Sequence, residues 1–137
     1  MEFNLSEILI IDDDEVVKIV ETRHLRKMDF FKPIFWFKNG LEGLMFIKSR
    51  PIQDHDRKQS LILLDIEMPV MDCWAFLWEF EQLDADIRSF YRIIVRTSSD
   101  NPDDRERILE IDSVREFLYK PLNPGLILEV FEKHGFV

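Results

Sequence analysis

The stretch Ile-Leu-Ile-Ile-Asp-Asp-Asp-Glu occupies residues 8–15 and joins an apolar run directly to four acidic side chains. The apolar run, Ile8 to Ile11, is typical of a strand that is covered on both faces of a sheet. The residues after it, Asp14 to Met28, have the spacing of a helix, and this spacing places Val16, Val17, Val20 and Met28 toward one side. The stretch therefore predicts a buried strand, an acidic junction and a helix.

The same strand-then-helix unit is repeated four more times. Strands are expected at residues 33–37, 60–64, 91–96 and 115–119, and helices at 41–50, 72–83, from Pro102 after an Asn101 cap, and 124–134. Alternating units of this kind predict a parallel sheet with helices on both faces. No stretch of the amino-acid sequence itself repeats and no linker interrupts the pattern, so we expect one domain over residues 1–137 with no output domain.

Composition narrows the class of protein. Of the 137 residues, 46% are hydrophobic, which is enough for a core, and 27 acidic against 18 basic residues give a formal charge of −9. This balance argues against a nucleic-acid partner and suits a cation site or a basic protein, or simply a solvated acidic surface. The single cysteine, Cys73, excludes an intrachain disulfide. The N-terminal stretch lacks a signal-peptide pattern and no apolar run is long enough for a membrane span, so we expect a soluble, cytoplasmic protein.

Polar residues follow four of the predicted strands. The first strand ends in Asp12, Asp13, Asp14 and Glu15, the third in Asp65, the fourth in Thr97-Ser98-Ser99 and the fifth in Lys120-Pro121. Functional groups of open α/β sheets gather at the carboxyl ends of the strands. Because those ends share one edge of a parallel sheet, several carboxylates, a hydroxyl and an amine should converge there.

This set of side chains has a specific chemistry. Clustered carboxylates repel one another unless a cation compensates them, and Mg²⁺ is bound by carboxylates, waters and phosphate. An aspartate can act as a nucleophile and become an aspartyl phosphate, whose oxygens Lys120 and Thr97 could then contact. Each residue has a simpler explanation: Asp14 as a helix cap, Thr97 as the start of a turn, Lys120 as an exposed lysine. Because all of these residues occur together and in order at the strand ends, they favour a phosphorylation site with Mg²⁺ over these separate explanations.

Four motifs carry a resemblance over essentially the whole chain. They are ILIIDDDE at 8–15, LILLDIEMPVMD at 61–72, IIVRTS at 93–98 and FLYKP at 117–121, and they resemble the response-regulator receiver family of two-component signalling. The resemblance implies a (βα)5 doubly wound, flavodoxin-like fold with a five-stranded parallel sheet in the order 2-1-3-4-5.

The resemblance also implies roles for individual residues. Asp65 would be the phosphoacceptor, Asp12 and Asp13 the acidic pair, and Glu67 the donor of a backbone carbonyl to Mg²⁺. Thr97 and Phe117 would be the switch pair. Lys120 would contact the phosphate and would precede a cis peptide bond to Pro121.

A function follows from these roles as an expectation. A histidine kinase or histidine phosphotransfer protein would supply the phosphoryl group, and the domain would catalyse only its own phosphorylation and dephosphorylation. Phosphorylation would change the face formed by the fourth helix, the fifth strand and the last helix. That face would bind a downstream protein or a second copy of the chain.

Three residues depart from the family pattern. Cys73 stands where the family usually has glycine, and we expect it to pack rather than to act as a redox sensor. Arg96 replaces the usual apolar residue before the switch hydroxyl, so it must either reach solvent or find a carboxylate. Phe117 replaces an aromatic residue that is often tyrosine. None of these changes removes a catalytic group.

Other functions remain open from the residues alone. Asp12 and Asp14 form a D-x-D pair after a strand, as in haloacid-dehalogenase-like phosphatases, but that interpretation leaves the Asp65 motif unexplained. A flavodoxin-like cofactor binder would need a glycine-rich phosphate loop, and the chain has only four glycines. A pseudo-receiver that works without phosphate is the remaining alternative.

Overall fold

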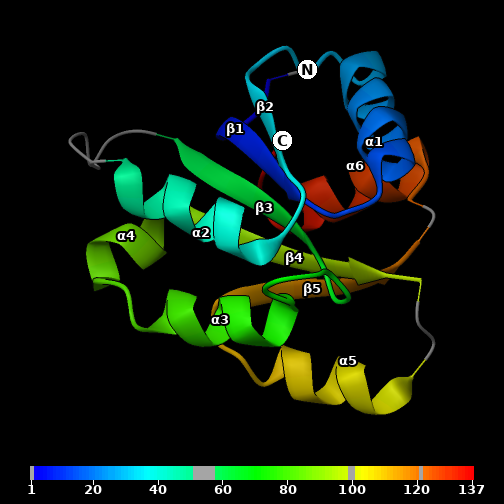
Figure 1. Ribbon diagram of the computed structural model, residues 1–137. Coiled ribbons are helices and arrows are strands. Elements are labelled where there is room, and N and C mark those ends of the chain that lie inside the picture. The colour runs from blue at the N-terminus through cyan, green and yellow to red at the C-terminus, as the bar shows by residue number, and fades with distance from the viewer. Residues whose placement is uncertain (1, 51–57, 99–100, 121) are drawn as a thin grey trace.

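The protein forms a five-stranded parallel sheet in a computed structural model that describes residues 2–50, 58–98, 101–120 and 122–137. The strands are β1 (Leu5–Ile11), β2 (Ile34–Phe37), β3 (Gln59–Asp65), β4 (Tyr91–Thr97) and β5 (Val114–Tyr119). Their order, β2-β1-β3-β4-β5, confirms the predicted doubly wound, flavodoxin-like topology (Figure 1).

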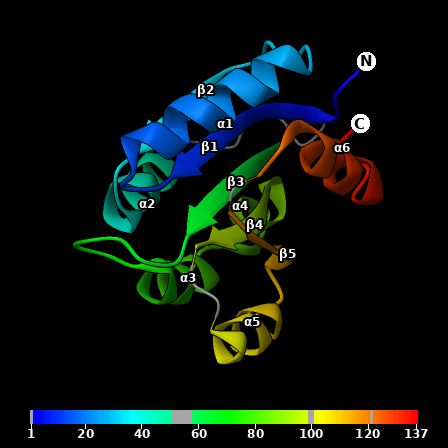
Figure 2. The ribbon, with the colours of Figure 1, turned by 90° about the vertical axis from the view of Figure 1, so that its right-hand side faces the viewer.

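Helices cover both faces of the sheet, as Figures 1 and 2 show. One face carries α1 (Glu15–Lys27) and α6 (Pro124–Lys133), and the other carries α2 (Gly40–Ser49), α3 (Cys73–Glu81) and α5 (Pro102–Leu109). Strand residues alternate between the two layers: Ile8 and Ile10 pack on the α1 and α6 side, whereas Leu9 and Ile11 pack on the other. Among the helices within the described ranges, none is both long and apolar enough to cross a lipid bilayer.

One helix, α4 (Ala85–Phe90), lies between α3 and β4 and was not predicted from the sequence. This helix has only six residues, which is too short for its apolar spacing to be recognised in sequence. Its last residue, Phe90, is buried in the core cluster that also contains Phe76 and Phe80 of α3. The helix is therefore held by a tertiary contact rather than by its own amphipathic pattern.

The predicted inner side of α1 was also wrong. Val16 is 66% exposed and Val20 is 38% exposed, so they do not share a buried side with Met28. The buried positions of the helix are instead Glu21 and Leu25. An acidic residue replaces an apolar one at the centre of this helix because a buried arginine of β4 lies opposite it, as described below.

The segment between β3 and α3 turns sharply beside the sheet edge. The Gly40 N–H donates to the carbonyl oxygen of Met71 over 3.0 Å, and a Cβ on Gly40 would lie only 2.7 Å from that oxygen.

Cys73 is buried, as predicted for a packing residue, and this burial raises the pKa of its thiol to about 12. The side chain of Asp72 caps α3 by accepting from Ala75 N–H.

Candidate functional site

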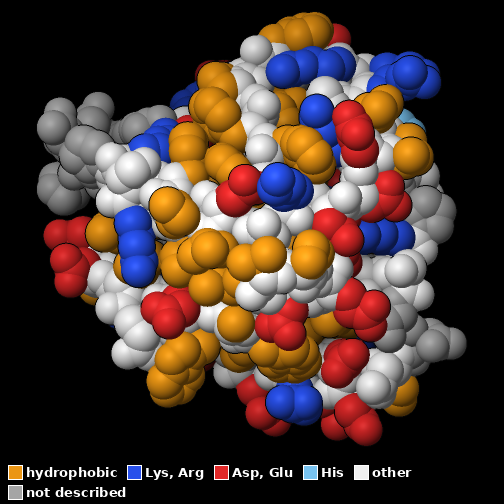
Figure 3. Space-filling view, in the orientation of Figure 1, with side chains coloured by type: hydrophobic (Ala, Val, Ile, Leu, Met, Phe, Trp, Pro, Cys, Tyr) orange, Lys and Arg blue, Asp and Glu red, His pale blue; other side chains and the backbone are white. Residues whose placement is uncertain are grey.

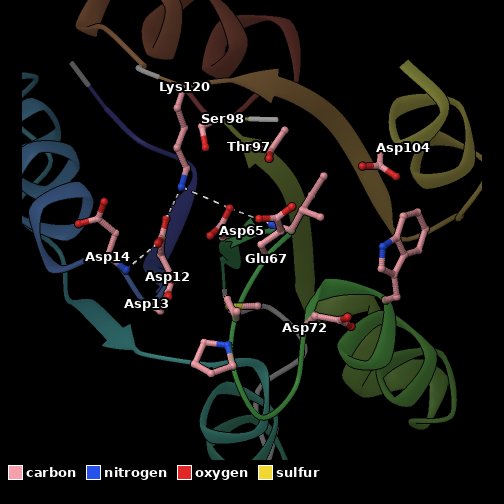
Figure 4. A pocket seen from close by; sticks show the side chains of 14 residues that line it. Asp12, Asp13, Asp14, Asp65, Glu67, Asp72, Thr97, Ser98, Asp104 and Lys120 are labelled. Carbon is pink, nitrogen blue, oxygen red and sulfur yellow. Dashed lines mark hydrogen bonds and ion pairs between the residues drawn. The ribbon is translucent and has the colours of Figure 1, made fainter. Parts of the chain in front are cut away.

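A pocket of about 630 Å³ opens at the carboxyl ends of the strands. Side chains at the ends of β3 and β4, and from the residues that directly follow β1 and β5, point toward it, and α3 and α5 form one wall (Figure 4). Its lining includes Asp12, Asp13, Asp14, Asp65, Glu67, Asp72, Trp74, Thr97, Ser98, Asp104 and Lys120. The convergence predicted from the strand ends is therefore confirmed as geometry. In Figure 3, acidic side chains gather on the right-hand part of the surface, toward which β3 and β4 run in Figure 1.

Three carboxylates form a cluster that could hold a metal ion. Ligand atoms of Asp12, Asp13 and Asp65 all lie within 4.8 Å of one another, with Asp12 and Asp65 buried and Asp13 exposed. Carboxylate oxygens are the ligands that Mg²⁺ prefers, and Mg²⁺ usually needs only one or two of them because waters and phosphate complete its shell. The donor set therefore fits this ion. Glu67 lines the same pocket.

Lys120 crosses the pocket to reach two of these carboxylates. Its Nζ lies 2.7 Å from Asp12 Oδ2 and 3.3 Å from Asp65 Oδ1. The backbone holds the lysine there, because the Lys120 N–H donates to the Thr97 carbonyl oxygen over 2.8 Å. The predicted cis bond to Pro121 lies outside the described residues.

The pKa of Asp65 is raised above its ordinary value by groups that act in opposite directions. Burial raises the pKa of its carboxyl, and the neighbouring Asp12 raises it further, while Lys120 and Arg96 act in the opposite direction; the net shift is upward. Its Oδ1 also accepts from the Ile66 N–H over 2.9 Å. Asp65 is thus oriented by a backbone donor and a lysine beneath an open pocket.

The two residues of the predicted switch pair occupy different places. Thr97 ends β4, is almost fully buried and lines the pocket. Phe117 is buried one strand away, in register with Val95, and its ring centroid lies 5.5 Å from that of Tyr119. The geometry places both residues near the strand ends of β4 and β5, and their movement stays a prediction.

Arg96 finds the carboxylate that its position demands. The guanidinium is completely buried and donates through Nε and Nη2 to the two carboxylate oxygens of Glu21 on α1, with Nε 2.7 Å from Oε2. Its Nη2 also lies 3.3 Å from Asp12 Oδ2. The sequence analysis missed Glu21. The signal that could have identified Glu21 is its position four residues before Leu25, on the same side of the helix, in a chain with an arginine in a predicted buried strand.

Asp14 acts as a helix cap. Its side chain accepts from the Val16 N–H over 2.9 Å at the start of α1, and its own N–H donates to Asp12 Oδ1 over 2.9 Å. This arrangement supports the simpler explanation of Asp14. It gives no support to a phosphatase-like pair of Asp12 and Asp14, because one of the two carboxylates is occupied by the helix terminus.

Comparisons with known proteins agree with this fold. A two-component response regulator from Cytophaga hutchinsonii is 22% identical, with coverage of 94% of this chain and 96% of that one and a TM-score of 0.74. One from Dyadobacter fermentans is 21% identical, with coverage of 93% and 95% and a TM-score of 0.79. The receiver domain of a Pseudomonas aeruginosa sensor histidine kinase, solved with magnesium in its active-site cleft, is 21% identical, with coverage of 94% and 96% and a TM-score of 0.72. No curated protein sequence gives a match.

The assignment to a family comes from the sequence itself. The family model described as the response regulator receiver domain matches residues 8–132, which include every residue that lines the acidic pocket. This match extends over most of the chain and agrees with the four motifs, the strand order and the convergence of carboxylates and lysine at one sheet edge. The chain therefore belongs to the family of response regulator receiver domains of two-component signalling.

Proposed function

We propose that Asp65 accepts a phosphoryl group from a phosphohistidine of a histidine kinase or histidine phosphotransfer protein, in a magnesium-dependent reaction. One observation carries the proposal: Lys120 Nζ lies 3.3 Å from Asp65 Oδ1 inside the pocket that also gathers Asp12 and Asp13. A nucleophilic carboxylate, its cationic partner and an acidic pair are thus together in one open cavity. The magnesium in the cleft of the Pseudomonas aeruginosa receiver supports the choice of ion.

The transfer needs few groups from the chain. A carboxylate oxygen of Asp65 attacks phosphorus, the phosphorus–nitrogen bond of the donor breaks, and the histidine nitrogen leaves with the bonding electron pair. Lys120, which already lies beside Asp65, would contact the phosphoryl oxygens and balance their charge. Mg²⁺, held by Asp12, Asp13, Asp65 and the Glu67 backbone carbonyl, would supply further charge compensation for the phosphoryl oxygens.

A docking place for the donor adjoins this pocket. Val16, Ile19 and Val20 form an exposed apolar strip on α1. Beside it, an apolar groove of about 190 Å³ is lined by residues of α1 together with Lys120 and Leu122. A donor protein that covers this strip would bring a histidine to the mouth of the pocket, because the groove and the pocket share Lys120.

The output would leave through a different face. The proposal assigns the surface of α5, β5 and α6 to a downstream protein or to a second copy of the chain. The domain would catalyse only its own phosphorylation and dephosphorylation. The alternative, a receiver that works without phosphate, is weakened because every group that the family uses at the acceptor site is present.

Intact-protein mass spectrometry after incubation with acetyl phosphate and Mg²⁺ tests the proposal. We expect one phosphoryl adduct that is released by hydroxylamine, as an acyl phosphate is, and that does not form in EDTA. Asp65→Asn should abolish it. Asp72→Asn, which removes a carboxylate of the same pocket that only caps α3, should retain it. Unlabelled wild type would favour the phosphate-independent alternative, whereas turnover of acetyl phosphate that persists in Asp65→Asn would indicate a phosphatase.

A further inference from the structure

Arg96 lies on the same side of the sheet as the reacting carboxylates. Asp12, Asp65 and Arg96 each follow by two residues a strand position that packs toward α1 and α6, namely Ile10, Leu63 and Ile94. Because side chains alternate along a strand, all three project toward that same layer. Asp65 and Arg96 are also direct partners in the β3–β4 register.

The guanidinium is costly to keep at this position. It is completely buried, and its Nη1 makes no hydrogen bond to any of the described residues. Burying an ion pair costs desolvation free energy that an apolar pair of the same volume would not incur. Stability alone therefore does not explain the Arg96–Glu21 pair. Arg96 makes a second contact, in which its Nη2 lies 3.3 Å from Asp12 Oδ2.

We propose that Arg96 is an internal counter-cation of the acidic pocket, and that Glu21, by balancing its charge, sets how strongly the pocket binds a divalent cation. The proposal rests on the magnesium site proposed above. It concerns a positioning pair behind the pocket, since Glu21 itself does not line the acidic cavity.

The two cations at Asp12 differ in freedom. Lys120 is partly exposed and reaches the pocket on a flexible side chain, so it can move toward a phosphoryl oxygen. Arg96 is fully enclosed and doubly hydrogen-bonded to Glu21, and these contacts hold its charge beside Asp12. A cation that takes Asp12 as a ligand therefore meets a fixed like charge in a solvent-excluded place, where charges interact strongly.

Asp12 does not depend on Arg96 for its orientation. Its Oδ1 accepts from the Asp14 N–H, and its Oδ2 contacts Lys120 at 2.7 Å. Removing the arginine together with Glu21 should therefore relieve the opposing charge without releasing the carboxylate. Removing only the charge of Glu21 should instead weaken the binding of a divalent cation, because the positive charge of the guanidinium beside Asp12 is then uncompensated.

A magnesium titration followed by tryptophan fluorescence tests this, and Glu21→Gln is the decisive variant. Its expected Mg²⁺ affinity is lower by about ten-fold, since a full unbalanced charge near the ion is worth at least one such factor at an effective dielectric constant of about 20. The matched control is Glu7→Gln, which breaks a second Glu–Arg pair of the described residues, between the buried Glu7 near the start of β1 and the partly exposed Arg50. It should cost stability but leave Mg²⁺ affinity unchanged.

The double variant Glu21→Met with Arg96→Met keeps the test sound if Glu21→Gln fails to fold. It should bind Mg²⁺ as tightly as wild type or a few-fold more tightly, because the opposing charge is gone. Unchanged affinity in Glu21→Gln, or weaker affinity in the double variant, would overturn the counter-cation role while the magnesium site stands. Wild type that binds no Mg²⁺ would instead overturn the proposed site together with this inference.

Discussion

The indole N–H of Trp36 donates to the backbone carbonyl oxygen of Asp12 over 2.8 Å. Trp36 lies near the end of β2, in register with Ile10, so its ring reaches past the last hydrogen bonds of β1 to the first residue of the acidic junction. Lys18 Nζ covers the ring at 4.6 Å from its centroid. The contact fixes the backbone from which the Asp12 side chain enters the pocket.

Trp36→Phe should therefore cost stability. It keeps an aromatic ring but removes the donor, and an unpaired, partly buried carbonyl costs about 1 kcal/mol or somewhat more. Urea unfolding measures this loss. Trp78→Phe is the control, because Trp78 is largely exposed on α3 and its replacement should change the free energy of unfolding by less than about 0.5 kcal/mol. Equal losses in the two variants would show that the hydrogen bond to Asp12 contributes nothing specific.

Asp13 provides the cleanest test of the acidic cluster. It is the exposed member of the three, so Asp13→Asn should leave the fold intact and, by relieving repulsion, should not lower the melting temperature without metal. Mg²⁺ affinity should fall by about ten-fold or more, because a carboxylate ligand becomes a neutral amide. The measurement is a fluorescence titration with Mg²⁺.

The control for this variant is Asp104→Asn, which removes an equal charge from the wall of the same pocket formed by α5. Its effect on Mg²⁺ affinity should be smaller, and it measures how much the loss of one negative charge anywhere in the pocket weakens binding. If both variants weaken Mg²⁺ binding equally, Asp13 acts through its charge at a distance and is not a ligand.

The sequence was sufficient for the parts of the site that follow from strand ends. The positions of Asp12, Asp65, Thr97 and Lys120 in the pocket could be predicted because parallel strands place their carboxyl ends at one edge. Contacts between residues remote in sequence could not. Glu21 and Arg96 are 75 residues apart; the arginine predicts a carboxylate partner, but the helical spacing of α1 does not by itself identify Glu21 as that partner.

Backbone conformation was likewise hidden from the sequence. Val70, in the segment after β3, has a φ of 69°, a left-handed conformation that β-branched residues rarely adopt. The helix α4 is hidden for a related reason, since tertiary packing of Phe90 rather than local pattern maintains it. The sequence predicts helices and strands whose apolar pattern extends over many residues. Short or strained segments are determined by the structure that surrounds them.

The pair formed by Glu116 and His134 should make stability depend on pH. Burial alone would raise the pKa of Glu116, but hydrogen bonds from His134 and Lys133, at 2.9 and 3.0 Å, outweigh burial and lower it. A lowered pKa in the folded state gives stability that is present above the unfolded-state pKa and is lost as pH falls through the folded-state value.

Glu116→Gln should accordingly melt a few degrees below wild type at neutral pH, and the difference should vanish in acid once Glu116 is protonated. Thermal unfolding followed by circular dichroism across pH measures it. Glu129→Gln removes an exposed carboxylate of α6 and should not reproduce this pH dependence. A difference in melting temperature that persists at a pH low enough to protonate Glu116 would mean that packing, and not the ion pair, is responsible.

The last prediction concerns how phosphorylation at Asp65 reaches a distant face. Thr97 ends β4 beside the pocket, and it pairs in register with Tyr119, while Val95 pairs with Phe117. A phosphoryl oxygen on Asp65 would attract the Thr97 hydroxyl as a hydrogen-bond donor. Inward movement of this side chain would open space behind β4, into which the buried Phe117 of β5 could rotate.

Beryllofluoride, which mimics the phosphoryl group on an aspartate, makes this coupling measurable by amide NMR. In wild type we expect shifts at Thr97, at Phe117 and along residues 126–131 of α6. Thr97→Ala should still accept a phosphoryl group but should lose the shifts at Phe117 and α6, because the bound group then has no differential contact with the two conformations. Thr97→Ser retains the hydroxyl and should keep them. Distant shifts in Thr97→Ala as large as in wild type would exclude the hydroxyl as the link and would direct the next test to Lys120, whose N–H donates to the carbonyl oxygen of the same residue.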